Sequence, residues 1–234
     1  MFVAIVFASF YVADRYGERP IKDFPKLATF RKVNGELKFI PDVIFIGDSI
    51  IANWNLETSF PGRAYVNRGI AWQTTSQVLL RMHQDVVDLH PRAVVIEVGT
   101  NDLTGIVGDV NTTEIQSNYR SMYEIASSNG IRVVFASVLP VNQYSKAAKS
   151  RRVFAFHPPE KIKALNQWLR AFSSEHGLPF LDYYTAMVDE WGFLRSDLSD
   201  DGVHPNIRGY SVMAKIVSEL RPTPELSREN SRTH

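Results

Sequence analysis

Short runs of apolar, largely β-branched residues alternate along the chain with longer segments in which apolar residues recur every three or four positions. The runs at residues 43–46, 93–98 and 131–138 read VIFI, AVVIEV and IRVVFASV. Such runs are typical of strands buried on both faces of a parallel sheet. Two weaker runs, at residues 64–67 and 179–182, predict two further strands.

Four segments between these strands carry the spacing of amphipathic helices. They run from Thr75 or Ser76 to Pro91, from Thr112 or Thr113 to Gly130, from Pro158 or Pro159 to Gly177, and from Asn206 to Leu220. Strands that alternate with helices predict βαβ units and a mostly parallel sheet with helices on both faces. Because no repeat or linker interrupts the pattern, we expect one domain.

Composition narrows the possible functions. The 234 residues include 26 Lys and Arg against 25 Asp and Glu, a net charge of +1, so no strong positive field is available to bind nucleic acid. The absence of cysteine excludes a disulfide framework, a thiol nucleophile and thiolate metal sites. The histidines at positions 83, 90, 157 and 176 show no ligand spacing, so we expect no metal site.

The two ends differ from the middle of the chain. The weakly polar run at residues 2–13 is shorter than the roughly 20 residues that a membrane span needs, so we expect no stable span. Two interpretations of the N-terminus remain: a signal-like leader in residues 1–13, or an ordinary packed segment within residues 1–40. The leader would imply export, and the packed segment would imply a cytoplasmic protein. The polar residues 221–234 predict a flexible tail.

Unusual polar residues follow the predicted strands. In parallel α/β sheets, ligands bind at the carboxyl ends of the strands, in the loops that follow them. Those loops contain Gly-Asp-Ser at 47–49, Asn-Arg-Gly at 67–69 and Gly-Thr-Asn-Asp at 99–102, and Asp-Gly-Val-His-Pro at 201–205 precedes the last helix. We therefore expect these four segments to lie together at one edge of the sheet.

These segments supply the residue types of a serine hydrolase. A serine hydroxyl needs a base to remove its proton, and the base needs a third group to fix its tautomer. Ser49, His204 and Asp201 supply all three types; Asp197 and Asp200 are rival partners for His204. The backbone N–H groups of Ser49 and Gly69 and the side-chain amide of Asn101 are candidate donors to an oxyanion.

The four segments resemble those of the SGNH, or GDSL, esterase and lipase family. The matching residues are Ser49 in IFIGDSI, Gly69 in VNRGI, Asn101 in VGTND and His204 in DGVHP, with Asp201 as the third triad member. The match extends over residues 41–220 and is similar especially to the branch akin to platelet-activating-factor acetylhydrolases and carbohydrate O-acetylesterases. The resemblance implies a flavodoxin-like three-layer α/β/α sandwich with five parallel strands, a small-molecule ester substrate and no cofactor.

Trp72 departs from the family pattern, because relatives commonly have a glycine at this position. An indole there would close the acyl channel and favour acetyl or other short-chain esters; alternatively, Trp72 packs over the following helix. Asp48 and Asp102 are expected to brace their loops through hydrogen bonds. The segment at residues 141–157 carries basic and aromatic residues and is either a solvated loop or a lid that touches substrate.

The sequence therefore predicts a hydrolase that cleaves short-chain carboxylic esters through an acyl-enzyme on Ser49. A catalytically silent carbohydrate- or lipid-binding module on the same fold is the alternative. Sugar acetates, lysophospholipids and thioesters all remain possible substrates, and the oligomeric state is not determined.

Overall fold

The apolar runs of the sequence form the strands of one parallel sheet. This computed structural model describes residues 24–104, 110–150 and 153–220. Five strands lie in the order β2-β1-β3-β4-β5, and all neighbouring pairs are parallel. They are β1 (Val43–Gly47), β2 (Tyr65–Gly69), β3 (Ala93–Glu97), β4 (Arg132–Ala136) and β5 (Phe180–Leu181). The predicted five-stranded α/β fold is confirmed.

The four predicted helices all form, and shorter helices occupy several of the connections. The long helices are α5 (Thr75–Asp85), α7 (Thr112–Ser128), α10 (Pro159–Glu175) and α12 (Ile207–Glu219). The others are α2 (Ala28–Glu36), α3 (Ser49–Ala52), α4 (Leu56–Ser59), α6 (Thr100–Leu103), α8 (Lys146–Ser150), α9 (Val153–Phe156) and α11 (Tyr183–Met187), with the 3₁₀ turn η1 (Val87–Leu89).

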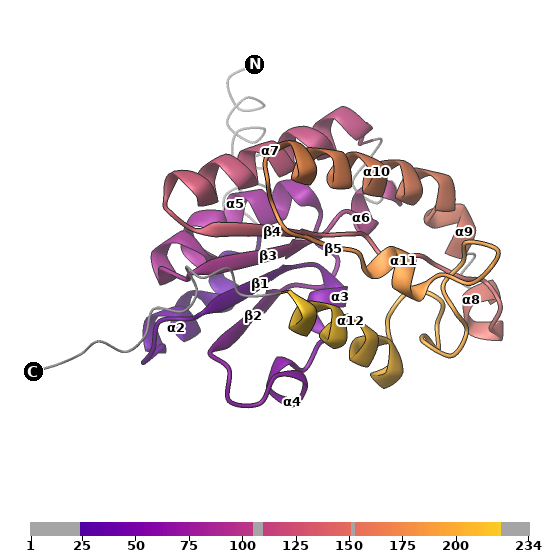
Figure 1. Cartoon of the computed structure of the whole chain (residues 1–234), viewed down its shortest axis with the longest axis horizontal. Coiled ribbons are helices and arrows are strands. Elements are labelled where there is room, and N and C mark those ends of the chain that lie inside the picture. Colours follow the sequence, from indigo (N-terminus) through magenta and orange to yellow (C-terminus); the bar gives the residue numbers. More distant parts are fainter. Residues whose placement is uncertain (1–23, 105–109, 151–152, 221–234) are drawn as a thin grey trace, which may run out of the picture.

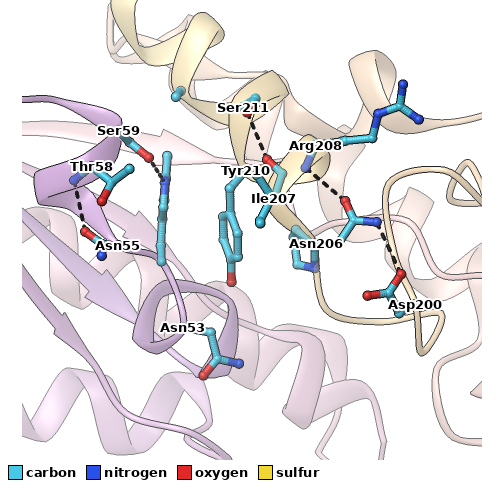
Figure 2. A pocket seen from close by; sticks show the side chains of 13 residues that line it. Asn53, Asn55, Thr58, Ser59, Asp200, Asn206, Ile207, Arg208, Tyr210 and Ser211 are labelled. Atoms are coloured by element: carbon cyan, nitrogen blue, oxygen red, sulfur yellow. Dashed lines mark hydrogen bonds between the residues drawn. The ribbon is translucent and has the colours of Figure 1, made fainter.

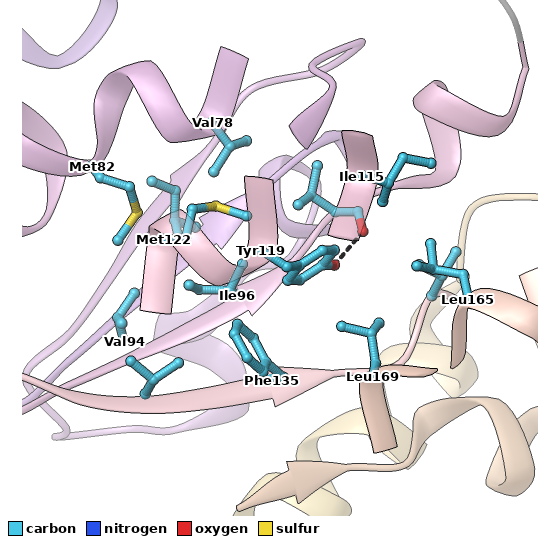
Figure 3. Packing of buried hydrophobic residues seen from close by; sticks show 14 of the residues in the cluster. Val78, Met82, Val94, Ile96, Ile115, Tyr119, Met122, Phe135, Leu165 and Leu169 are labelled. Atoms are coloured by element: carbon cyan, nitrogen blue, oxygen red, sulfur yellow. Dashed lines mark hydrogen bonds between the residues drawn. The ribbon is translucent and has the colours of Figure 1, made fainter. Parts of the chain in front are cut away.

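Alternating side chains on the strands divide the apolar core into two clusters. On β1, Ile44 and Ile46 belong to one cluster and Phe45 belongs to the other. Helices α5, α7 and α10 cover the first cluster (Figure 3), and α3, α11 and α12 cover the second. Figure 1 shows α7 and α10 on one side of the sheet and α4 and α12 on the other. The three layers therefore follow from the period-two alternation of the strands.

The helix predicted from Thr75 or Ser76 to Pro91 differs at both ends. Its N-cap is Thr74, whose N–H donates to Gln77 Oε1 at 3.1 Å. The helix ends at Asp85, and Val86 leaves helical geometry at φ −131°. Two consecutive β-branched residues disfavour helix, and the break lets both Val86 and Val87 pack into the core.

The chain before the sheet is held against α5 by side-chain amides. Gln73 Nε2 donates to the Pro25 carbonyl at 2.8 Å, and Gln84 Nε2 donates to the Leu27 carbonyl at 2.6 Å. The leader predicted for residues 1–13 and the tail predicted for residues 221–234 lie outside the described residues. Within the described ranges, no helix is long and apolar enough to cross a membrane.

The segment at residues 141–157 is more ordered than a loop, because it contains the short helices α8 and α9. Val141 and Ala148 are buried in the first core cluster. The burial of Val141 and Ala148 therefore holds this segment against the core of the domain. The basic residues of the segment hide this apolar pattern in the sequence. Arg151 and Arg152 lie outside the described residues.

Candidate active site

The candidate site lies where the chain leaves β1 and β3 toward opposite faces of the sheet. In a sheet of this strand order, the divergence of these connections leaves a crevice at the carboxyl ends of β1 and β3. Gly47 is paired with Glu97 in this register, and a Cβ on Gly47 would lie 1.9 Å from the Glu97 carbonyl oxygen. Glycine is therefore required for the turn that presents Ser49.

Ser49, His204 and Asp201 form a continuous line of hydrogen bonds. Ser49 Oγ lies 3.0 Å from His204 Nε2, and His204 Nδ1 lies 2.8 Å from Asp201 Oδ2. Because Nδ1 faces a carboxylate, it carries the ring proton and leaves Nε2 to accept from the serine hydroxyl. The structure thus brings together three predicted residues separated by up to 155 positions.

The Asp201 loop holds its carboxylate in the ionised form. Burial raises the pKa of Asp201, but hydrogen bonds from the His204 ring and from the His204 and Val203 N–H groups lower it, with a net decrease to about 2. Gly202 allows this geometry with φ 85°, and a Cβ there would lie 2.3 Å from the Asn142 carbonyl oxygen. The carboxylate therefore stays charged opposite His204 over the whole neutral range.

The two rival aspartates contact other groups. Asp197 forms an ion pair with Arg195, at 3.0 Å between Nη2 and Oδ2. Asp200 Oδ1 accepts from Asn206 Nδ2 at 3.4 Å. Among the three candidates, Asp201 is the one that the structure places against the His204 ring.

Asn101 is placed at the cavity that contains Ser49, whereas the Gly69 N–H is bonded to another residue. Asn101 lines the same cavity as Ser49, and its Nδ2 donates to the Gln73 carbonyl at 2.9 Å. The Gly69 N–H already donates to Asn67 Oδ1 at 2.8 Å, and a Cβ on Gly69 would lie 2.2 Å from the Ala52 nitrogen. The packing of β2 against α3 is therefore sufficient to explain the glycine at position 69.

Trp72 lies at the mouth of the cavity in an unusual backbone conformation. It has φ 70°, a left-handed value that non-glycine residues seldom adopt. Trp72 is 68% exposed, so most of its surface is open to solvent. Trp72 and Ala71 both line the cavity that contains Ser49.

This cavity has a volume of about 780 Å³ and combines the polar side chains of Ser49, Asp201 and His204 with several apolar side chains. It is lined by Ser49, Asn53, Ala71, Trp72, Thr100, Asn101, Thr104, Val153, Phe156, His157, Asp201, Val203 and His204. The size is in the usual range for small-molecule sites. Val153 and Phe156 come from α9, so the segment at residues 141–157 does contribute to the site.

Asn53 and His157 are among the lining residues that were not predicted from the sequence. Asn53 follows Ser49 by four positions, a spacing that places both on one side of a helical turn and could have indicated it. His157 Nδ1 donates to the Val153 carbonyl at 3.2 Å. Burial lowers the pKa of His157, the Val153 carbonyl and Asp201 raise it, and His204 lowers it, with a net decrease. The sequence around His157 carries no signal of this position.

Three buried carboxyl groups lie behind the site, at Asp48, Glu97 and Asp102. Asp48 Oδ1 accepts from the Ile50 N–H at 2.9 Å, and Asp102 Oδ2 accepts from the Thr75 N–H at 3.0 Å, as predicted for residues that brace their loops. Both carboxyl oxygens of Glu97 are buried without a hydrogen-bond partner among the described residues, and burial raises the pKa of this group well above its usual value. No group of three potential metal ligands occurs in the described ranges.

Asp48 is expected to make the stability of the protein depend on pH. Burial raises its pKa from 3.8 to about 7, although the Ile50 N–H lowers it. Because the folded state favours the protonated form, the wild-type free energy of unfolding should fall as pH rises from about 4 to about 7. Asp48→Asn removes this titration and keeps the acceptor for Ile50.

Urea unfolding at several pH values measures this difference. Asp48→Asn should gain stability relative to the wild type between pH 4 and pH 7. The exposed Asp88→Asn controls for the loss of one carboxylate. A constant difference between Asp48→Asn and the wild type over this range would contradict the prediction.

Comparison with known proteins finds similar sequences and similar folds. The model of the GDSL-like lipase/acylhydrolase family matches residues 45–212. A GDSL-like lipase from Bacteroides thetaiotaomicron is 34% identical, with a TM-score of 0.75 over 84% of this chain and 97% of that one. A proposed acylhydrolase from Bacteroides fragilis is 35% identical, with a TM-score of 0.76 over 84% and 96%. Esterase TesA of Pseudomonas aeruginosa is 24% identical over 77% of this chain and 86% of its own length.

Proposed function

The chain belongs to the GDSL-like lipase/acylhydrolase family, a family of ester hydrolases, and we propose that it cleaves short-chain carboxylic esters through an acyl-enzyme on Ser49. The observation that carries the proposal is the line of hydrogen bonds from Ser49 Oγ through His204 to Asp201, at 3.0 and 2.8 Å. No observation favours the alternative of a silent binding module.

In the proposed reaction, Ser49 Oγ attacks the ester carbonyl while His204 Nε2 takes its proton. His204 then gives this proton to the departing alcohol, which leaves an acyl group on Ser49. A water molecule, activated by the same nitrogen, attacks the acyl group and releases the acid. Asp201 stabilises the charged ring in both steps because its carboxylate stays ionised.

The negative oxygen of each tetrahedral intermediate needs hydrogen-bond donors. Ser49 is the first residue of α3, so its N–H has no intrahelical acceptor and is free to donate. Asn101 Nδ2 is the second proposed donor. It now donates to the Gln73 carbonyl at 2.9 Å and to Asp48 Oδ2 at 3.5 Å, and the longer of these two bonds would be exchanged for a bond to the oxyanion. The third, predicted at Gly69, would have to give up its bond to Asn67. We therefore propose that the third donor to the oxyanion is a peptide N–H of Ala71 or Trp72, two residues that line the cavity.

Ser49→Ala should lower kcat for acetate esters by about four to six orders of magnitude, because the nucleophile is lost. The turn needs no hydroxyl to fold, so the thermal unfolding midpoint should stay close to that of the wild type. A serine-directed organophosphonate should label the wild-type protein at Ser49, which peptide mass analysis would locate. Substantial activity in the variant, or a label on another serine, would show that the assignment is wrong.

Asp201→Asn should lower kcat by about 10³- to 10⁴-fold, since an amide can hold His204 in the wrong tautomer. Asp200→Asn is the matched control, one position away and hydrogen bonded to Asn206 instead. It should keep kcat within about threefold of the wild type. Similar losses in the two variants would exclude a specific role for Asp201.

Trp72 is proposed to limit the length of the acyl chain. The wild type should prefer acetate to octanoate esters, and Trp72→Gly should shift the ratio of kcat/KM toward octanoate, because each buried methylene contributes about 0.8 kcal/mol. Glycine tolerates φ 70° at this position, so the variant should fold. Trp191→Gly controls for the loss of an exposed indole outside the cavity. An unchanged ratio in Trp72→Gly would exclude this role.

A further inference from the structure

The reacting groups lie in the smaller of two adjoining hollows. The larger one, of about 980 Å³, is formed mainly by α4, the residues before it and the start of α12 (Figure 2), and neither Ser49 nor His204 lines it. The smaller one contains both of these side chains, with Trp72 and Asn101 in its wall. The contacts that hold Trp72 and Asn101 in place therefore bear on the reaction itself.

Trp72 lies in a tight turn that follows β2. The Ile70 N–H donates to the Gly47 carbonyl at 3.0 Å, and the Gln73 N–H donates back to the Ile70 carbonyl at 3.3 Å. In a four-residue turn closed in this way, a positive φ at the third residue favours glycine, and here Trp72 has φ 70°. Backbone of this kind persists only where the surrounding structure holds it.

Gln73 supplies such support at the end of the turn. It is fully buried, and both polar atoms of its side-chain amide are hydrogen bonded at 2.8 Å: Nε2 donates to the Pro25 carbonyl, and Oε1 accepts from Arg81 Nε. Arg81 is also fully buried and donates in turn to the Asp85 carboxylate and the Arg68 carbonyl. The Gln73 side chain is therefore fixed between α5 and the chain that precedes the sheet.

The main chain of Gln73 also holds the amide of Asn101. Asn101 Nδ2 donates to the Gln73 carbonyl at 2.9 Å, which uses one of its two hydrogens and leaves the other for the oxyanion. A shift of the turn would move this carbonyl and, with it, the Asn101 donor and the peptide groups of the cavity wall. Displacements of about 1 Å in such groups can lower a rate by about 100-fold.

We infer that Gln73 is a positioning residue for the reaction at Ser49. Its buried side chain fixes the turn at residues 70–73, and its carbonyl thereby fixes the Asn101 amide. The inference rests on the proposed function, in which this amide is a donor to the oxyanion. Gln73 acts through these neighbours, since it is not among the residues that line the cavity.

The inference also gives the chain before the sheet a part in catalysis. Pro25, whose carbonyl holds Gln73, lies outside residues 45–212, the part of the chain that the family model matches. Leu27 supplies a similar carbonyl to Gln84 Nε2, at 2.6 Å, but Gln84 lies at the end of α5 that is distant from the turn. The two glutamines thus make the same kind of contact with this segment, and only the contact of Gln73 reaches the turn.

Gln73→Met removes both side-chain hydrogen bonds and nearly preserves the size of the side chain. It should lower kcat for p-nitrophenyl acetate about 10- to 100-fold and change KM by less than about threefold, because displaced donors stabilise the transition state less while the ester is still bound. Gln84→Met is the matched control. It should also lower stability in urea unfolding, but kcat should stay within about threefold of the wild type.

The Asn101→Ala background tests whether Gln73 acts through Asn101. In that background, Gln73→Met should lower kcat by only about threefold, because the donor that Gln73 positions is already absent. A purely structural role would lower kcat equally in both backgrounds. If Gln73→Met does not fold, Gln73→Glu allows the same comparison, since it keeps an acceptor for Arg81 and loses the donor to Pro25.

The outcomes separate this inference from the proposed function. Hydrolysis that depends on Ser49, with a kcat that Gln73→Met leaves unchanged or lowers no more than Gln84→Met does, would overturn the positioning role alone. An equal loss of kcat in the wild-type and Asn101→Ala backgrounds, or a change confined to KM, would also overturn it. If the wild type does not hydrolyse the ester and Ser49 resists the organophosphonate, the proposed function fails and the inference fails with it.

Discussion

The site depends on the close approach of β1 to its two neighbours at their carboxyl ends. Gly47 is in register with Gly69 on one side and Glu97 on the other, and a Cβ on Gly47 or Gly69 would overlap neighbouring backbone. Because these backbones meet without intervening side chains, the turns after β1 and β3 lie next to each other. Ser49 and Asn101 consequently face one cavity.

This arrangement places carboxyl groups where water cannot reach them. Asp48 and Asp102 are compensated by backbone N–H groups, whereas Glu97 has no partner for either oxygen among the described residues. Burial of such groups raises their pKa values and opposes folding at higher pH. Asp201 differs, because its hydrogen bonds outweigh its partial burial and keep it charged. Similar side chains thus differ in charge according to their surroundings.

The sequence by itself determined the strands, the four long helices and the residue types of the site. Buried strands and amphipathic helices have local periodicities, and Ser49, Asn101, Asp201 and His204 lie in short motifs that are recognisable in one dimension. The break at Val86 was not predictable in this way, because it depends on which side chains reach the core. Only the tertiary structure showed that the Gly69 N–H is occupied, that Trp72 is exposed at the cavity mouth, and that Asn53 lines the cavity that contains Ser49. These properties depend on contacts between residues distant in sequence, whose distances no local pattern specifies.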